Sequence, residues 1–425
     1  MKRLNLNKVV LVLTMLITYQ SLFAQVADSV TSSKKKQKKM NVPQLLFNGV
    51  AVPDDSRNRS WFIGPVLDLL QYNTIEGLVF NPRVSMTQQL NEGKFYAIKP
   101  NLRYGFGSER LYGQVSTLYF YNPSRFGSFS LNGGNFVKQF DQKSTLTPFG
   151  NSYSTLLLKE NYLKVYESTF LEISHSFSPI RNLQLTNHVF WSSRSSLKNL
   201  EKYNTAKGDY LSNVPVNKEV TRTAFDDHQV FFQQTEVRWQ PNLSYEYERG
   251  KLLATNQSPA IILRYKSAHS SILGSDLSYQ SISVGIEGNV QAGSLGEGEF
   301  SIEGGNFISK DSLSFTDFTH FQGNRTSYTT YESGTFQLLD YFTESTYGHY
   351  FRGHYTHKFG QLTNRRGINP FQPIIESNVL LKDELSYFEL GIGLQGMTKP
   401  WRVSFYNSWQ NGKHDRSEIR FGFVL

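Results

Sequence analysis

Gly391-Ile-Gly393-Leu-Gln-Gly396 has the glycine spacing found in dinucleotide sites. Such a site needs a turn from a strand into a helix, so that backbone N–H groups meet the pyrophosphate. Here the glycines lie inside a run that alternates apolar and polar residues and continues towards Lys399 and Pro400. We therefore interpret them as strand residues that make room for neighbouring side chains, and the sequence predicts no nucleotide site.

His349, His354 and His357 lie within nine residues of one another and have the side chain that most often binds metals. On one strand, His349 and His357 would share a face about 26 Å apart, and His354 would point to the opposite face. Three imidazoles at this spacing cannot reach one metal ion without a bend. We interpret them as separate surface or lumen histidines.

Asp226, Asp227 and His228 are adjacent in a polar stretch. Carboxylates beside an imidazole could position a water for hydrolysis, with the histidine as the base. Adjacent residues seldom converge on one substrate atom, and Ser174 next to His175 lacks the Gly-x-Ser-x-Gly context of a nucleophile. The sequence therefore predicts no catalytic residue, no cofactor site and no metal site.

Composition excludes several classes of site. The chain has 425 residues and no cysteine, which excludes disulfides, thiolate metal sites and a cysteine lipid anchor. Eight of its 44 basic residues and one of its 35 acidic residues precede residue 40, so the remainder carries a net charge of about +2. The pI near 9.3 is thus mainly an N-terminal property, and a nucleic-acid partner is not expected.

The N-terminus has the features of an export signal. Lys2, Arg3 and Lys8 precede an apolar run over 9–19, and Ala24 provides a small residue for cleavage. We expect a signal peptide over 1–24 and a disordered, basic and polar leader over 25–60. Pro53-Asp-Asp-Ser56 has the composition of a turn.

From residue 61 onwards the chain alternates apolar and polar residues in segments of about ten, the length of a tilted membrane-crossing strand. The clearest segments cover 183–191, 236–240, 243–248, 281–287, 388–395 and 401–409. Soluble sandwich strands are shorter, and aromatic residues make up 14% of this chain, as interfacial girdles require. We predict an all-β, transmembrane, antiparallel outer-membrane β-barrel of about 14 to 16 strands over residues 61–425.

Tight turns are expected at Asn91-Glu-Gly93, Gly107-Ser-Glu109, Asn122-Pro-Ser124 and Lys382-Asp383. Long connections are expected over about 142–164, 197–228 and 309–330. The first has helical apolar spacing between Ser154 and Tyr166, and we interpret it as a candidate plug or gate.

The last residues form a strand with two unlike faces. Ile419, Phe421, Phe423 and Leu425 share one side, and Glu418, Arg420 and Gly422 share the other. We expect the apolar side to face outer-membrane lipid and the terminal strand to be engaged by the barrel-assembly machinery. We also expect this strand to pair with the first strand, near 72–80, so that no edge is open in lipid.

Seven stretches resemble a family of Bacteroidota outer-membrane proteins whose barrel is a domain of unknown function. They are Tyr72-Asn-Thr-Ile-Glu-Gly77, Tyr104–Gly113, Tyr121-Asn-Pro-Ser-Arg-Phe126, Gly133–Phe140, Asn161–Glu167, Phe318–Asn324 and Glu389-Leu-Gly-Ile-Gly393. Many members carry a carboxypeptidase-regulatory-like sandwich before the barrel, for which this chain has no room between the signal and the first strand. The resemblance implies an outer-membrane barrel and supplies no catalytic residue.

Together these patterns predict a non-enzymatic outer-membrane barrel that serves transport, assembly or envelope structure. The alternative is a barrel hydrolase acting at the extracellular rim, with Asp226, Asp227 and His228 as its best candidates. A soluble secreted β-protein is a third hypothesis.

Overall fold

Strands make up most of the described chain. The computed structural model describes residues 46, 48–203, 210–243, 245–248, 251–254, 259–332, 334–361, 371–396 and 401–424. Residues 45–425 form one compact unit. The expected signal peptide over 1–24, the lysine-rich part of the leader and Leu425 lie outside the described residues.

The first strands are mostly short, and those that follow are long. The strands are β1 (Val50–Asp54), β2 (Arg59–Ile63), β3 (Leu70–Asn73), β4 (Gly77–Phe80), β5 (Val84–Gln89), β6 (Phe95–Gly105), β7 (Arg110–Asn122), β8 (Gly127–Gln139), β9 (Val165–Ile180), β10 (Leu183–Ser196), β11 (His228–Trp239), β12 (Tyr245–Glu248), β13 (Lys251–Ala254), β14 (Ala260–Ala268), β15 (Ser278–Gln291), β16 (Glu297–Ser312), β17 (Tyr328–Tyr331), β18 (Tyr350–Lys358), β19 (Phe371–Lys382), β20 (Leu385–Gly396), β21 (Trp401–Gln410) and β22 (Lys413–Val424). The helices are α3 (Val66–Leu69), α4 (Pro148–Tyr153) and the π-helical η4 (Ser154–Leu158). Short 3-10 turns are η1 (Asp55–Arg57), η2 (Asn91–Gly93), η3 (Pro123–Arg125), η5 (Glu201–Tyr203), η6 (Ile272–Gly274), η7 (Gly293–Leu295) and η8 (Phe315–Asp317).

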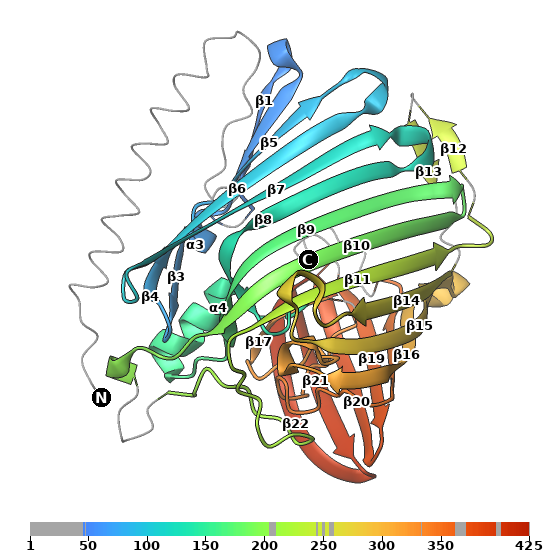
Figure 1. The fold of residues 1–425 in the computed structure, drawn as a ribbon. Helices are drawn as coiled ribbons and strands as arrows, with labels where there is room; N and C mark the ends of the chain where they lie inside the picture. Colours follow the sequence, from blue (N-terminus) through green and yellow to red (C-terminus); the bar gives the residue numbers. More distant parts are fainter. Residues whose placement is uncertain are drawn as a thin grey trace. The chain divides into compact units, whose positions relative to one another are not determined.

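Twenty of the described strands belong to one curved sheet (Figure 1). From β6 to β22, neighbours in the sheet follow one another along the chain and pair antiparallel, except that β12, β13 and β17 are passed over. The sheet divides at β6, whose first half pairs with β5 and whose last residues pair with β4. β12 and β13 form a separate two-stranded ribbon.

Side chains alternate between two unlike faces along each long strand. In β20, Phe388, Leu390 and Ile392 are exposed, whereas Tyr387 and Glu389 between them are buried. A strand places successive side chains on opposite faces, so an apolar outer face and a polar inner face follow directly from the sequence alternation. The all-β, antiparallel, outer-membrane type of barrel predicted from the sequence is confirmed.

All four predicted tight turns are confirmed. They connect β5 to β6, β6 to β7, β7 to β8 and β19 to β20. The sheet contains more strands than the predicted 14 to 16, because β1 to β4 and β17 are too short to show a clear alternation. It also begins earlier than residue 61, since β1 and β2 form a hairpin around the expected turn at Pro53–Ser56.

The predicted pairing of the last strand with the stretch near 72–80 is wrong. β22 pairs antiparallel with β21, and its other edge pairs in parallel with β17, from Tyr328 opposite Phe421 to Tyr331 opposite Val424. Gly422 permits this approach, because a Cβ there would collide with the backbone carbonyl oxygen of Thr329. The free edge of β22 is thus occupied by a strand from the middle of the sequence.

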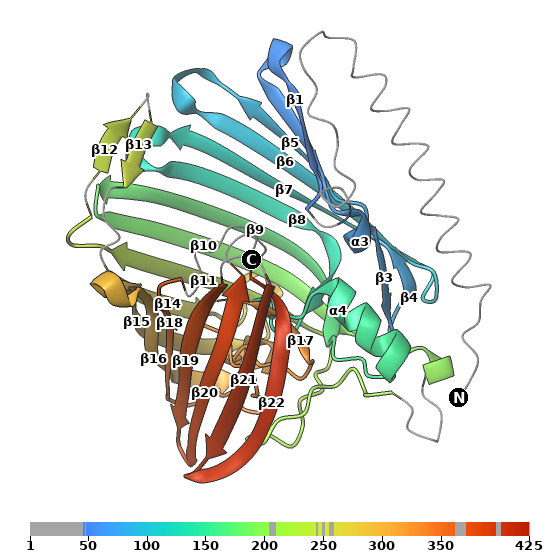
Figure 2. The same ribbon diagram turned by 180° about the vertical axis from the view of Figure 1, so that it is seen from behind.

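A helix lies between β17 and β3 (Figure 2). On one side, the hydroxyl of Ser152 in α4 accepts a hydrogen bond of 2.8 Å from the backbone N–H of Tyr72 in β3. On the other side, Thr147 and Gly150 line a small crevice together with Thr329 of β17. We call β17, α4 and η4 the seam, since they occupy the stretch of wall between β22 and β3.

The space inside the sheet contains a core rich in aromatic rings. Its members include Tyr112, Phe136, Phe170, Phe190, Phe232, Tyr279 and Phe307. Part of the aromatic content that we expected in interfacial girdles therefore lies inside the barrel. Among the described helices, none has both the length and the apolar character needed to cross a bilayer.

Candidate functional site

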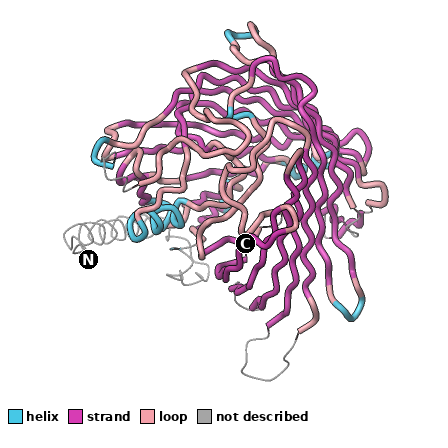
Figure 3. The backbone as a smooth tube through the Cα atoms, turned by 90° about the horizontal axis from the view of Figure 1, so that it is seen from below, coloured by secondary structure: helices cyan, strands magenta, loops and turns pink. Residues whose placement is uncertain are grey.

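Loops cross the space that the strands surround (Figure 3). The connection from β16 to β18, residues 313–349, is bound to the inner face of the strands through Glu389 and Arg194. We call this connection the inner segment; it contains η8 and β17. The segment is longer than the predicted connection over 309–330. Its residues Phe336 and Leu338 are fully buried, which requires that the segment pack against the inner face of the barrel.

Glu389 of β20 fixes one part of the inner segment. Its fully buried carboxylate accepts hydrogen bonds from three consecutive backbone N–H groups, at residues 337–339, over 2.8 to 3.0 Å. It also accepts from the Asn378 amide at 3.0 Å and the Tyr387 hydroxyl at 2.6 Å. All five partners are donors, so the carboxylate acts as an ionised acceptor that satisfies a turn of otherwise unpaired backbone.

Asp317 fixes a second part of the segment, on the far side of the barrel. Its carboxylate lies 2.5 Å from the Arg194 guanidinium of β10 and 3.4 Å from the Lys266 ammonium of β14, and it accepts from the Tyr279 hydroxyl at 2.8 Å. Burial alone would raise the pKa of Asp317, but the two cations outweigh burial and hold that pKa well below its usual range. The carboxylate is therefore ionised at neutral pH.

The other long connections enclose the inner segment. The amide of Asn217 donates to the carbonyl oxygens of Phe342 and Ser345 at 2.8 and 2.9 Å. Rings from three connections meet at Phe140. Its ring centroid lies 5.6 Å from Phe225, between β10 and β11, and 6.3 and 6.2 Å from Phe315 and Phe342 of the inner segment. Apolar packing and hydrogen bonds thus both hold the segment inside the barrel.

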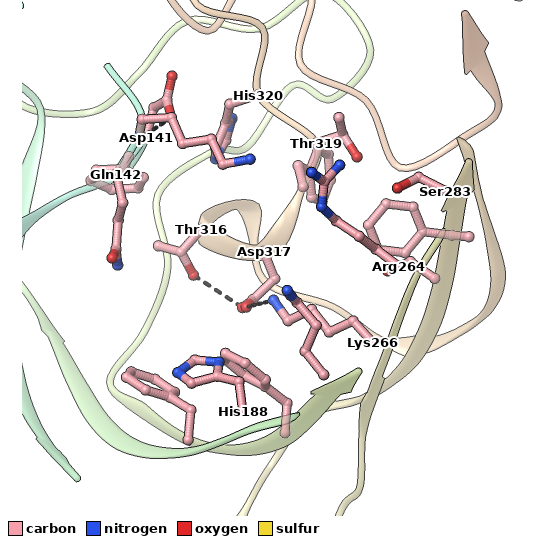
Figure 4. Close-up of a pocket in the computed structure, with 18 of the residues that line it drawn as sticks. Asp141, Gln142, His188, Arg264, Lys266, Ser283, Thr316, Asp317, Thr319 and His320 are labelled. Carbon is pink, nitrogen blue, oxygen red and sulfur yellow. Dashed lines mark hydrogen bonds and ion pairs between the residues drawn. The ribbon is translucent and has the colours of Figure 1, made fainter. Parts of the chain in front are cut away.

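A cavity of about 400 Å³ remains between the inner segment and the wall (Figure 4). Asp141, Lys143 and Glu172 line it together with two networks of charged groups. In one, Glu303 is 2.7 Å from Arg264 and 3.2 Å from Arg352; in the other, Asp317 pairs with Arg194 and Lys266. The cavity can therefore hold polar molecules or water, with fixed charges of both signs on its walls.

Lys143 also lines this cavity, from the connection after β8. Its backbone N–H donates to the Asp141 carboxylate at 2.9 Å, which fixes the loop. Burial and the neighbouring guanidinium groups of Arg264 and Arg352 lower the pKa of Lys143. The lysine side chain is itself exposed, and the two arginines near it are paired with the carboxylates of Glu303 and Glu236.

The helical spacing predicted between residues 154 and 166 is partly confirmed, since α4 and η4 span 148–158. Leu156, Leu157 and Leu158 are exposed, whereas Asn151 and Thr155 are buried. This amphipathic stretch belongs to the seam and not to the centre of the lumen. The inner segment occupies the centre, which the sequence analysis did not predict.

The three histidines considered from the sequence have separate partners. The Nε2 atom of His349 is 3.0 Å from Asp383, the buried His354 contacts the Asn378 amide oxygen at 2.9 Å, and His357 lies 3.1 Å from the Leu295 carbonyl oxygen. Across the described residues, no cluster of three metal-ligating side chains is found.

Asp226, Asp227 and His228 also face different partners. Asp226 pairs with Arg222 at 3.0 Å, and both side chains are exposed. Asp227 accepts a hydrogen bond from the backbone N–H of Ser196 at 3.2 Å, and His228 packs against the ring of Phe225. The trio does not converge on one point, so the rim-hydrolase hypothesis loses the geometry on which it depended.

The interpretation of the glycine run is supported by geometry. Side chains at Gly391 and Gly393 would collide with the ring of Tyr406 and the hydroxyl of Ser404 on the adjacent strand β21. Both glycines lie within β20 and precede no helix among the described residues. They provide space for inward-facing neighbours, as expected.

Sequence reasoning missed Glu389, Asp317 and Lys143. Glu389 belonged to an alternating segment and began one stretch of the family resemblance, but neither gave it a role; Asp317 lies in a connection without a recognisable motif. A weak signal did exist, because the conspicuous stretch Phe318–Asn324 in the resemblance lies directly after Asp317.

Three solved structures illustrate what the chain is similar to. The crystal structure of BamA from Haemophilus ducreyi lacking POTRA domains 1–3 gives a TM-score of 0.45 at 13% identity, over 89% of this chain and 75% of that one. CdiB from Escherichia coli gives 0.39 at 7% identity, over 87% and 63%. A double mutant of the Rh. blastica porin gives 0.35 at 10% identity, over 85% and 96%. A comparison with curated proteins finds no match.

A family model covers most of the chain. The model is described as "Family of unknown function (DUF5686) C-terminal domain", and it matches residues 43–394, from just before β1 to within β20. The matched range includes the inner segment with Asp317, as well as Glu389 and Lys143. The chain therefore belongs to the family of unknown function DUF5686, through that family's C-terminal domain.

Proposed function

We propose that this protein is a non-catalytic, integral outer-membrane β-barrel that acts as a gated conduit, closed by its inner segment. One observation carries the proposal. The inner segment is tied to the inner face of the barrel at both sides, through Asp317 to β10 and β14 and through Glu389 of β20. A folded segment across the lumen closes a conduit until that segment moves.

The distribution of side chains supports a membrane location. Large apolar side chains are exposed along the outer face of successive strands, as with Leu390 and Ile392 in β20 and Val403 and Phe405 in β21. Charged side chains on the inner face pair with one another across strands, such as Arg402 with Glu376 at 2.5 Å. An apolar exterior with a polar interior is the arrangement that a bilayer requires.

Export and assembly belong to the same proposal. A cleaved signal peptide over 1–24 would deliver the chain to the cell envelope, and outer-membrane lipid would contact the apolar face. The barrel-assembly machinery would engage the C-terminal strand through Ile419, Phe421, Phe423 and Leu425. Ile419 and Phe421 are exposed on β22, the side chain of Phe423 lies outside the described side chains, and Leu425 outside the described residues.

The conduit is tested by single-channel recording in planar lipid bilayers. The wild-type protein should insert and remain closed at most times. Glu389→Gln, which removes acceptors from residues 337–339, should produce frequent openings. Glu384→Gln makes the same chemical change in the exposed turn between β19 and β20, and it should behave as the wild type.

Two outcomes would contradict the proposal. Steady, wide conductance of the wild-type protein would show that the inner segment does not close the lumen. A Glu389→Gln protein whose inner segment is released, but which never conducts, would show that the barrel is not a conduit. Fractionation provides a separate check, since recovery in the soluble periplasm would end the membrane assignment.

A further inference from the structure

The amphipathic stretch formed by α4 and η4 has its polar side chains buried and its large apolar side chains exposed. Three polar residues are at most 1% exposed: Asn151, Ser154 and Thr155. Five apolar residues are 43 to 58% exposed: Phe149, Tyr153, Leu156, Leu157 and Leu158. A surface helix of a water-soluble protein has the opposite arrangement, because it buries its apolar stripe and leaves polar residues in water. The exposed face of this stretch is therefore suited to apolar surroundings.

The buried polar face is satisfied within the protein. The side-chain amide of Asn151 donates to the side-chain oxygen of Asn161 at 2.9 Å, and its oxygen accepts from the backbone N–H of Leu163 at 2.9 Å. The hydroxyl of Thr155 donates to the backbone carbonyl oxygen of Asn151 at 2.7 Å. These bonds fix which side of the stretch is buried. The leucines cannot turn inward without leaving buried polar groups unpaired, which is costly.

The strands beside the stretch have the same division of their side chains. α4 lies next to β3 (Figure 2), and Ser152 of α4 is bonded to the β3 backbone as described above. In β3, Gln71 and Asn73 are buried polar residues. In β4, which pairs with β3, Phe80 is exposed. A buried polar side and an exposed apolar side thus continue from the sheet into the seam.

We propose that the exposed face of α4 and η4, formed by Phe149, Tyr153 and Leu156–Leu158, contacts the acyl chains of the outer-membrane bilayer. The seam is then a helical part of the membrane-facing wall. An exposed apolar patch of this kind serves either lipid or a protein partner. Lipid is favoured, because the neighbouring strands present apolar side chains to the bilayer on the same principle. The inference rests on the proposed membrane location.

Site-directed spin labelling tests this contact in the full-length protein, reconstituted in liposomes. The chain has no cysteine, so one introduced cysteine carries the only nitroxide. The three variants are Leu157→Cys, Ile392→Cys on the exposed face of β20, and Lys198→Cys in the exposed connection after β10. Electron paramagnetic resonance measures collisions with oxygen, which concentrates in hydrocarbon, and with a nickel chelate, which stays in water. Labels at 157 and 392 should collide mainly with oxygen, and the label at 198 mainly with the chelate.

The label at position 392 separates failure of this inference from failure of the proposed membrane location. If position 157 behaves like 198 while 392 stays in hydrocarbon, the seam faces water and the inference is overturned. If position 157 collides with neither reagent, a protein surface covers it, which also overturns the inference. If position 392 itself lies in water, the membrane location is wrong, and lipid contact at the seam is excluded with it.

A matched pair of variants gives an independent measurement. Asparagine has nearly the volume of leucine but is polar, so Leu157→Asn should lower the urea concentration at the unfolding midpoint in liposomes. Leu157→Ile, which keeps the side chain apolar, should leave the midpoint almost unchanged. A midpoint that is unchanged or higher in Leu157→Asn would contradict the inference, because an exposed polar group is tolerated in water and not in hydrocarbon.

Discussion

Glu389→Gln is the substitution for which the structure allows the clearest estimate. Glutamine has nearly the shape of glutamate, so packing inside β20 is preserved. It replaces one carboxylate oxygen by an NH2 group, which donates and cannot accept. The five donors that now meet the carboxylate would then face one acceptor and one further donor.

The magnitude follows from counting the bonds that each orientation of the amide loses. With its NH2 group in place of Oε2, the amide loses the bonds from the Gln337 backbone and from Asn378. In the other orientation it loses three bonds, from Leu338, Leu339 and Tyr387. A hydrogen bond to a charged group contributes about 1.5–3 kcal/mol, so the loss of two weakens the attachment by about 3–6 kcal/mol.

Hydrogen exchange measured by mass spectrometry reports on this attachment directly. Since about 1.4 kcal/mol corresponds to a factor of ten, the amides of residues 337–339 should exchange about 100- to 10,000-fold faster in Glu389→Gln. Amides of β19 and β20 should keep their protection, because their ladder bonds are unchanged. Glu384→Gln should match the wild type throughout.

The reasoning would be refuted by unchanged exchange at residues 337–339 in a folded Glu389→Gln protein. That result would mean that packing of the buried Phe336 and Leu338, and not the carboxylate, holds the segment. A general rise in exchange across the neighbouring strands would also contradict it, since the effect would then be on the wall.

Three further predictions concern the outer face, the seam and the response to acid. Leu390 lies at the centre of β20 on the exposed face. Leu390→Arg should lower the free energy of unfolding, measured with urea in liposomes, by about 2–4 kcal/mol, and Leu390→Ile should hardly change it. Gly422→Ala should lower the free energy of unfolding by about 1–3 kcal/mol and speed hydrogen exchange in β17, because its Cβ would collide with the β17 backbone. Gly304→Ala, where a Cβ has enough space, should change neither quantity. Asp317 has a folded-state pKa below its unfolded value of about 3.9, so its stabilisation is complete above that pH and is lost as pH falls below it. In the wild type, the urea concentration at the unfolding midpoint should therefore decrease as the pH is lowered from 4. The decrease should be smaller in Asp317→Asn.

Long strands and tight turns were predictable because their signals are local. Alternation over ten residues defines two faces, and Asn122-Pro-Ser124 has the composition of a turn wherever it occurs. The inward glycines of β20 could be interpreted in the same way. These features depend on neighbours within a few residues of one another.

The inner segment was not predictable in this way. β17 has only four residues, and its parallel pairing with β22 joins positions about ninety residues apart. Glu389 has the same local sequence pattern as any charged residue on a lumen face. Its neighbours in the sequence give no indication that it binds residues 337–339. Contacts between distant segments determine the candidate site, and a single sequence carries little information about them.

The seam has a consequence for how the barrel can open. β17 is both the strand that covers the free edge of β22 and a part of the segment that fills the lumen. If the whole segment left the lumen, β22 would lose its parallel partner, and its backbone groups would be exposed at the membrane. Emptying the barrel and parting its wall are thus linked events, and a passage that keeps the wall intact must leave residues 328–331 in place.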